Sequence, residues 1–90
     1  MRFTWDDNKR RQNLRKHGLD FEIVCELDWN RARLYDLQFH DDGEREIIVI
    51  PNKLNLLTAV ILDKGDTKRV ISLRAASPRE QRWYFEETEW

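Results

Sequence analysis

The chain has 90 residues, of which 40% are hydrophobic and 37% are charged, and its formal net charge is −1. The longest run without a charged residue covers nine positions, 54–62, whereas a helix that crosses a membrane needs about 20. Four Trp, four Phe and two Tyr are more aromatic residues than a solvated, disordered chain carries. The composition therefore excludes a membrane span and a disordered tail, and we expect residues 1–90 to form one domain.

Charge is distributed unevenly along the chain. Residues 1–20 carry a net charge of +3 and residues 51–82 a net charge of +4, whereas residues 21–50 carry −5 and residues 83–90 carry −3. If the fold brings the two basic segments together, they form a positive face that could hold a phosphate backbone. The alternative is that these charges only solvate the surface.

Motifs for phosphate loops, dinucleotide binding, zinc proteases and calcium loops are absent from the sequence. The single cysteine, Cys25, excludes an internal disulfide and a cysteine-based zinc site. The first residues contain no apolar stretch typical of a secretory signal. We therefore expect a cytoplasmic protein that uses neither a metal nor a cofactor.

The N-terminal region predicts a short strand and a first helix. Residues 3–5 are β-prone, and the helix is expected over residues 8–17. Asp6 or Asp7 can cap its N-terminus, and Gly18 stands where a glycine commonly ends a helix in the left-handed conformation.

A second helix is predicted over residues 21–27, after a cap at Asp20. The spacing i, i+3, i+4 and i+7 would place four residues on one face of an α-helix, namely Phe21, Val24, Cys25 and Asp28.

Four strands and a last helix are predicted for the rest of the chain. Turn signals separate strands over residues 32–37, 44–50, 54–62 and 69–74. Ser77 and Glu80 form a capping box for a helix over residues 78–87. The predicted fold is α+β, a mainly antiparallel β-sheet with two N-terminal helices and one C-terminal helix.

Three blocks of the sequence together resemble the BrnT toxin family, and they cover nearly the whole chain in order. The blocks are Phe3-x-Trp5-Asp6-x-x-Lys9, Asn13-Leu14-x-Lys16-His17-Gly18-x-x-Phe21-Glu22 and Arg69-Val70-Ile71-Ser72-x-Arg74-x-Ala76-x-x-x-Glu80-x-x-x-Tyr84, with Gly43-Glu44 at a strand start between them. The resemblance implies a RelE-like fold and a ribonuclease toxin of a type II toxin–antitoxin system. It also implies a BrnA-like antitoxin that neutralises the toxin and binds DNA, so that the toxin meets DNA only through its partner.

Cleavage of RNA without a metal needs cations that hold the phosphorane, a group that takes the 2′-OH proton and a group that protonates the leaving 5′-oxygen. We assign phosphate binding to Lys16, Arg69 and Arg74. Alternation along a strand would place Arg74 on one face with Lys68, Val70 and Ser72. Its planar fork suits phosphate, and the alternative role is a salt bridge to Glu80 or Glu44.

Three side chains are candidates for proton transfer, namely Glu44, His17 and Tyr84. His17 could act as an acid or a base, but a histidine at a helix C-terminus can also be structural. Glu44 is either a base or a solvated strand end, and Tyr84 is either a proton donor or a half-buried core residue. The alternative function is a non-catalytic module on the same fold that binds nucleic acid or the antitoxin.

Overall fold

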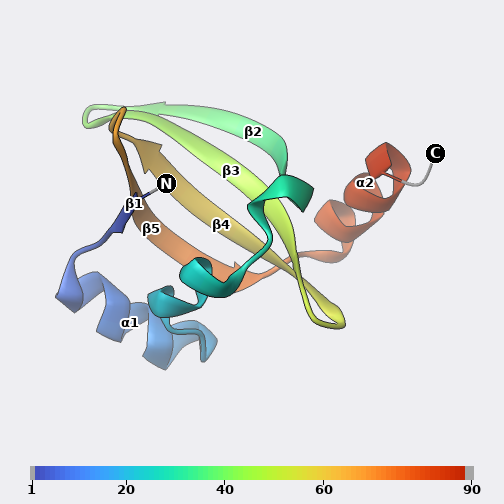
Figure 1. Cartoon of the computed structure of the whole chain (residues 1–90), viewed down its shortest axis with the longest axis horizontal. Coiled ribbons are helices and arrows are strands. Elements are labelled where there is room, and N and C mark those ends of the chain that lie inside the picture. Colours follow the sequence, from blue (N-terminus) through green and yellow to red (C-terminus); the bar gives the residue numbers. More distant parts are fainter. Residues whose placement is uncertain (1, 89–90) are drawn as a thin grey trace.

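The computed structural model describes residues 2–88 and has an α+β fold with one five-stranded sheet (Figure 1). The strands lie in the order β1-β5-β4-β3-β2. Among the described residues, no helix is long and apolar enough to cross a membrane. The elements in chain order are β1 (Arg2–Thr4), α1 (Asp7–His17), the 3-10 helices η1 (Phe21–Glu26) and η2 (Trp29–Arg31), β2 (Arg33–His40), β3 (Gly43–Asn52), β4 (Asn55–Asp63), β5 (Thr67–Ala75) and α2 (Pro78–Thr88).

The sheet is mixed. Strands β2 to β5 pair antiparallel with their neighbours, as the short turns between them predict, whereas β1 runs parallel to β5. Pairing between β1 and β5 covers only three residues, because α1 begins soon after Thr4. The edge of β5 beyond Arg69 is therefore left to α1 rather than to another strand.

The second predicted helix forms, but as the 3-10 helix η1 rather than as an α-helix. Ile23 N–H donates to the Asp20 carbonyl at 3.1 Å, an i→i+3 bond, and residues three apart eclipse in such a helix. Phe21, Val24 and Leu27 have this spacing and are all buried, whereas Cys25, expected beside them on an α-helical face, is exposed. The burial pattern of residues 21–27 thus follows a period of three rather than the α-helical spacing.

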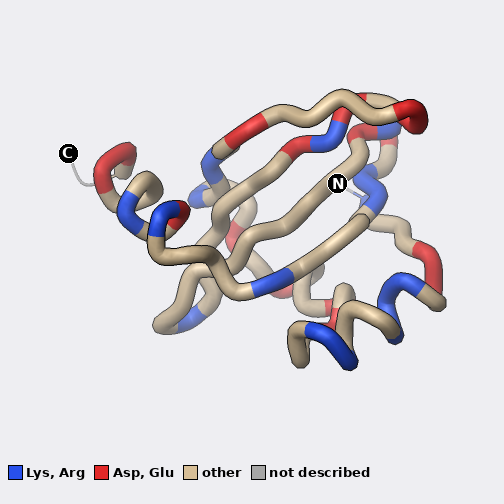
Figure 2. Tube along the Cα trace, turned by 180° about the vertical axis from the view of Figure 1, so that it is seen from behind, with Lys and Arg blue, Asp and Glu red and all other residues tan. Residues whose placement is uncertain are grey.

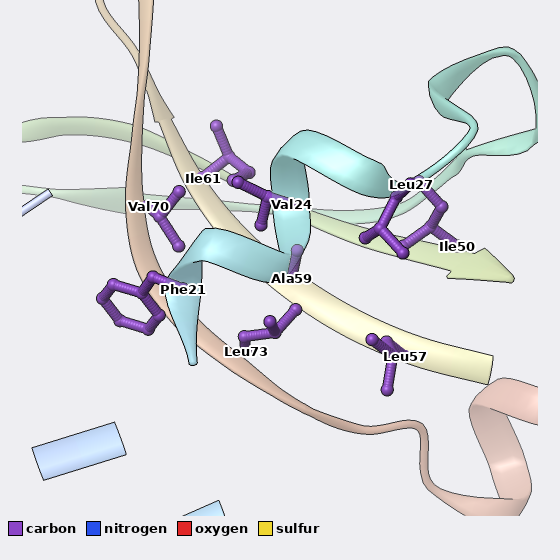
Figure 3. Close-up of a cluster of buried hydrophobic side chains, with 9 residues drawn as sticks. All are labelled: Phe21, Val24, Leu27, Ile50, Leu57, Ala59, Ile61, Val70 and Leu73. Carbon is purple, nitrogen blue, oxygen red and sulfur yellow. The ribbon is translucent and has the colours of Figure 1, made fainter. Parts of the chain in front are cut away.

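The main core lies between η1 and one face of the sheet, which we call the core face (Figure 3). Phe21, Val24 and Leu27 pack there against buried side chains of three strands, Ile50 from β3, Leu57, Ala59 and Ile61 from β4, and Val70 and Leu73 from β5. On the opposite face, the only helix of residues 2–88 is α2, which packs at one end of the sheet.

Helix α2 begins at the predicted capping box. Glu80 N–H donates to Ser77 Oγ at 3.1 Å, and Ser77 N–H donates back to Glu80 Oε1 at 2.8 Å. Tyr84 is buried one turn later and packs with Val49 and Ala76. The cap fixes where α2 starts and therefore which end of the sheet it covers.

We predict that Ser77→Ala lowers the free energy of unfolding by about 0.5–2 kcal/mol, because the N–H of Glu80 loses its acceptor. Chemical denaturation followed by circular dichroism measures the change. Pro78→Ala keeps the cap and serves as the control. Unchanged stability in Ser77→Ala would show that the capping box does not contribute.

Candidate functional site

A shallow groove of about 150 Å³ runs between α1 and the outer edge of β5. Its wall on the strand side is formed by Ile71 and Ser72. Its wall on the helix side is polar and basic, and consists of Lys9, Gln12, Asn13, Lys16 and His17. We call this feature the α1–β5 groove.

The helix side of the groove follows the helical period. Lys9, Gln12, Asn13 and Lys16 stand at i, i+3, i+4 and i+7 and so share one face of α1. The helix has few apolar residues, and both of its ends are capped. Asp6 accepts from Asn8 N–H at 2.8 Å, and Gly18, with φ of 71°, donates its N–H to Leu14 at 2.9 Å. This polar surface of α1 turns toward β5, although it is not apolar, because one of its side chains forms hydrogen bonds with the strand.

That side chain is Asn13, which is 7% exposed. Its Nδ2 donates to the Leu73 carbonyl at 2.8 Å and to the Leu19 carbonyl at 2.9 Å. Its Oδ1 accepts from Leu73 N–H at 3.1 Å and from Ser72 Oγ at 3.4 Å. The amide thus supplies the donor and the acceptor that a neighbouring strand would give to β5.

A β-bulge changes which side chains share a face of β5. Val60 pairs with Ser72 and Ile61 pairs with Val70, so Ile71 is the extra residue. The bulge places Val70 and Leu73, three residues apart, together on the core face. The prediction that Lys68, Val70, Ser72 and Arg74 share one face is therefore wrong, because strict alternation fails at a bulge.

After this correction, the candidates Arg69 and Arg74 lie with Ser72 on the face of the sheet opposite the core face. Arg69 pairs with Leu62, Ser72 pairs with Val60, and Arg74 pairs with Thr58, and paired residues of antiparallel strands point to the same side. Bulges commonly occur beside active sites, where they redirect side chains. Here the bulge places Arg69 on the same face of the sheet as Ser72, which lines the α1–β5 groove.

Several cations near the groove have no acidic partner. Within residues 2–88, Lys9, Lys16 and Arg69 form no ion pair, whereas Arg10 pairs with Asp20 at 3.0 Å and Lys68 pairs with Asp63 at 2.7 Å. Figure 2 shows basic segments along α1 and at both ends of β5, and acidic segments along β2 and the β2–β3 turn. The uneven charge of the sequence thus becomes a basic edge and an acidic edge on opposite sides of the sheet.

Arg74 is held by Glu80. Its Nη1 and Nη2 donate to the two carboxylate oxygens at 2.7 and 2.9 Å, and Nη1 also reaches the Ala75 carbonyl at 3.3 Å. Glu80 further accepts from Thr58 Oγ1 at 2.9 Å. Burial would raise the pKa of Glu80, but the hydrogen bonds from Arg74, Ser77 N–H and Thr58 outweigh it and lower the pKa to about 2.

The three proton-transfer candidates lie in three different places. His17 is half-buried in the α1–β5 groove, next to Lys16. Glu44 is exposed at the start of β3, opposite Phe39, and β4 separates it from β5. Tyr84 is 4% exposed on α2, and its hydroxyl donates to the Arg31 carbonyl at 2.7 Å. Of these candidates, the fold brings only His17 together with the basic residues.

The comparison with known proteins agrees with the resemblance seen in the sequence. The family model for the ribonuclease toxin BrnT of type II toxin–antitoxin systems matches residues 5–80. The chain belongs to the BrnT family. The crystal structure of the Brucella abortus ribonuclease toxin BrnT is 31% identical, with a TM-score of 0.70, and the match covers 86% of this chain and 97% of that one. No curated protein matches the chain.

Two features of the groove in this BrnT-family protein were missed from the sequence. The role of Asn13 was not predicted, although the polar face formed by Lys9, Gln12, Asn13 and Lys16 has a plain helical spacing. The bulge at Ile71 was also missed, and no residue at this position marks it, since glycine is absent there. The first feature was readable from periodicity, whereas the second needs the register of β4 against β5.

We predict a specific acid dependence of stability from Glu80. The pKa of Glu80 is about 2 in the folded protein, below its ordinary value of 4.5. The ionised carboxylate therefore contributes fully to the free energy of unfolding above pH 4.5, and this contribution is lost as the pH falls toward 2. The loss should be about 3 kcal/mol, and Glu80→Gln, which does not titrate, should show a correspondingly flatter dependence. Urea denaturation at several pH values from 5 to 2 measures both proteins. Asp42 and Asp63, whose pKa values are also lowered, contribute to both, so equal slopes would contradict the prediction.

Proposed function

We propose that this BrnT-family protein cleaves RNA at the α1–β5 groove, without a metal or cofactor. The family consists of ribonuclease toxins of type II toxin–antitoxin systems, which supports cleavage of RNA at a general level. The observation that carries the location is that two unpaired cations, Lys9 and Lys16, line the groove beside His17, while a third, Arg69, lies on the adjoining strand β5. Cations without acidic partners are free to neutralise phosphates along a strand of RNA.

Lys16 and Arg69 are proposed to hold phosphates on α1 and on β5. Lys16 is exposed and lines the groove, whereas Arg69 is half-buried on β5, outside the groove lining and on the same face of the sheet as Ser72. Lysine supplies a mobile point charge, whereas arginine can grip two phosphate oxygens. RNA that contacts both residues would extend from the groove onto this face of β5.

Arg74 is proposed to hold phosphate while it remains paired with Glu80. A guanidinium has five N–H donors, and Glu80 and the Ala75 carbonyl take three of them, two from Nη1 and one from Nη2. The two donors that remain free are Nε–H and the second Nη2–H, which point in the same direction from one side of the guanidinium. The side chain is 33% exposed, so a phosphate can reach this pair of donors. The ion pair with Glu80 would therefore orient the fork in advance of RNA binding rather than consume it.

His17 is the proton-transfer residue that the groove supports best. The reaction needs a base for the 2′-OH and an acid for the 5′-oxygen, and an imidazole can serve in either role near neutral pH. A role for Glu44 requires the RNA to extend to the far side of the sheet, and a role for Tyr84 requires its hydroxyl to leave the Arg31 carbonyl. We therefore propose Glu44 and Tyr84 only as alternatives to His17 in proton transfer.

Membership in a type II system implies an antitoxin partner, and we propose that it is BrnA-like and that it alone contacts DNA. We also propose that residues 1–90 act as one RelE-like toxin domain in the cytoplasm.

A second candidate function is that of a non-catalytic module that only binds RNA or the antitoxin. It is favoured because the groove holds only one of the three proton-transfer candidates, His17. Growth arrest together with loss of RNA integrity on expression distinguishes the two, because binding alone leaves RNA intact.

We predict that Lys16→Ala and Arg69→Ala each lower RNA cleavage by about tenfold or more, because each removes a charge that stabilises the phosphorane. Single-turnover cleavage of a labelled RNA measures the loss. Lys64→Ala is the control, since Lys64 is an exposed cation in the β4–β5 turn. Activity lost equally in all three variants would point to general charge rather than to the groove. Loss of wild-type activity in EDTA would contradict the metal-independent mechanism.

We predict that Arg74→Lys retains the fold but loses most cleavage, because an ammonium cannot hold Glu80 and grip phosphate with a fork at the same time. Arg74→Ala should abolish most cleavage too, but it leaves a buried carboxylate unpaired at a cost of about 3–5 kcal/mol. The double variant Arg74→Ala/Glu80→Gln removes that charge and separates activity from folding. Full cleavage by a folded Arg74→Lys protein would show that Arg74 is a structural residue only.

A further inference from the structure

Strand β2 is an exposed edge of the sheet with an apolar row along it. Among residues 2–88 it pairs only with β3, so within this part of the chain the polar backbone groups on its outer side have no neighbouring strand. Leu34, Leu37 and Phe39 are 48, 38 and 78% exposed. A register shift at Tyr35 brings Leu34 onto the same face as Leu37 and Phe39, because they pair with Ile48, Glu46 and Glu44 on β3. We call this row and its free backbone the β2 edge.

An apolar hollow of about 140 Å³ lies next to the β2 edge on the core face, beyond the part that η1 covers. Its apolar lining consists of Phe3, Trp29, Ile48 and Ile61, and the rings of Phe3 and Trp29 have centroids 5.1 Å apart. Its charged lining consists of Glu46 and of Lys68, which pairs with Asp63 at 2.7 Å. Since Ile48 pairs with Leu34, the hollow continues the apolar row across the sheet. An extended chain laid against β2 could place an apolar side chain into it.

The charge around the β2 edge decides which partner fits. Asp36 lies on the strand, Asp41 and Asp42 lie in the turn that follows, and Glu44 and Glu46 begin β3. Two arginines accompany these five acids, Arg33 at the start of β2 and Arg45, which pairs with Asp42 at 2.9 Å, so residues 33–46 keep a net charge of −3. Such an edge repels RNA, and it also repels a second copy of itself, whereas it attracts a basic segment.

We propose that an extended, basic and apolar segment of the antitoxin adds to β2 as a sixth strand and places an apolar side chain in the hollow of Phe3 and Trp29. Main-chain hydrogen bonds along an edge strand provide affinity, and alternate side chains provide specificity. The acids beside the edge select the basic residues of the segment. The proposal rests on the presence of an antitoxin, which type II membership implies, and it names the surface that this antitoxin binds.

The test uses the toxin co-expressed with the protein encoded by the adjacent reading frame. Leu37→Lys/Phe39→Lys places two cations on the edge and removes two of the three side chains of its apolar row. The affinity for that protein should fall by about tenfold or more, as for a central interface position. Leu54→Lys, at a fully exposed leucine in the β3–β4 turn, is the matched control and should bind like the wild type. Hydrogen exchange should show protection of the amides of residues 36–40 in the wild-type complex only.

Unchanged affinity of a folded Leu37→Lys/Phe39→Lys protein would overturn the proposal, as would unprotected β2 amides in the wild-type complex. A wild-type toxin that forms a dimer alone, and becomes a monomer in the double variant, would assign the edge to a second copy instead. Tighter binding of RNA by the double variant, with no change in antitoxin affinity, would assign it to nucleic acid. RNA cleavage by each free toxin is measured separately, so a failure of catalysis is distinguished from a failure of this interface.

Discussion

The side-chain amide of Asn13 joins α1 to β5, the two elements that form the candidate site. Beyond Arg69, no strand of the described residues lies on the outer side of β5, so without Asn13 the N–H and C=O of Leu73 would be buried there unpaired. An unpaired buried polar group costs about 1–3 kcal/mol, so the position of α1 is strongly specified once Asn13 bonds to both groups. Helix α1 has little apolar surface to hold it, and this amide sets its orientation against the sheet.

The consequence is that Lys16 and His17 are carried to the rim of β5 by a polar contact rather than by hydrophobic packing. Polar contacts of this kind have defined directions, whereas apolar packing tolerates sliding. A groove that binds phosphate needs fixed charges, because reorganisation during the reaction weakens electrostatic stabilisation. The same bond therefore serves stability, through Leu73, and function, through the residues one turn further along α1.

Caps and turns could be predicted from the sequence because they depend on neighbouring residues. Asp6, Gly18 and the Ser77–Glu80 box all occupy their predicted roles. The 3-10 form of η1 was hidden because Phe21, Val24 and Leu27 fit an α-helical stripe nearly as well as a period of three. The parallel pairing of β1 could not be predicted, since it joins segments more than 60 residues apart in sequence.

The site was predictable in its parts but not in its assembly. Lys16 and His17 are adjacent in the sequence, and Arg69 and Arg74 share a strand, so each pair could be named. The bulge at Ile71 decides which face the arginines take, and it arises from the register of β5 against β4, which is a long-range property. Glu44 was grouped with these residues on chemistry alone, and the order of the strands places it on the other side of the sheet.

Separation of the two charged edges has a consequence for inhibition. Strands β5 and β2 are three strand spacings apart, about 14 Å, which exceeds a Debye length of about 10 Å at 0.1 M salt. The acids of β2 therefore do little to neutralise the cations of the groove, and both edges keep their charge. An antitoxin segment bound at β2 leaves the groove open, so anchoring and inhibition would fall to different parts of the antitoxin. The part that reaches the groove must be acidic to match Lys9, Lys16 and Arg69, whereas the part on β2 must be basic. A partner with this charge order along its chain would bind in one direction only, since the reverse orientation places like charges together at both edges.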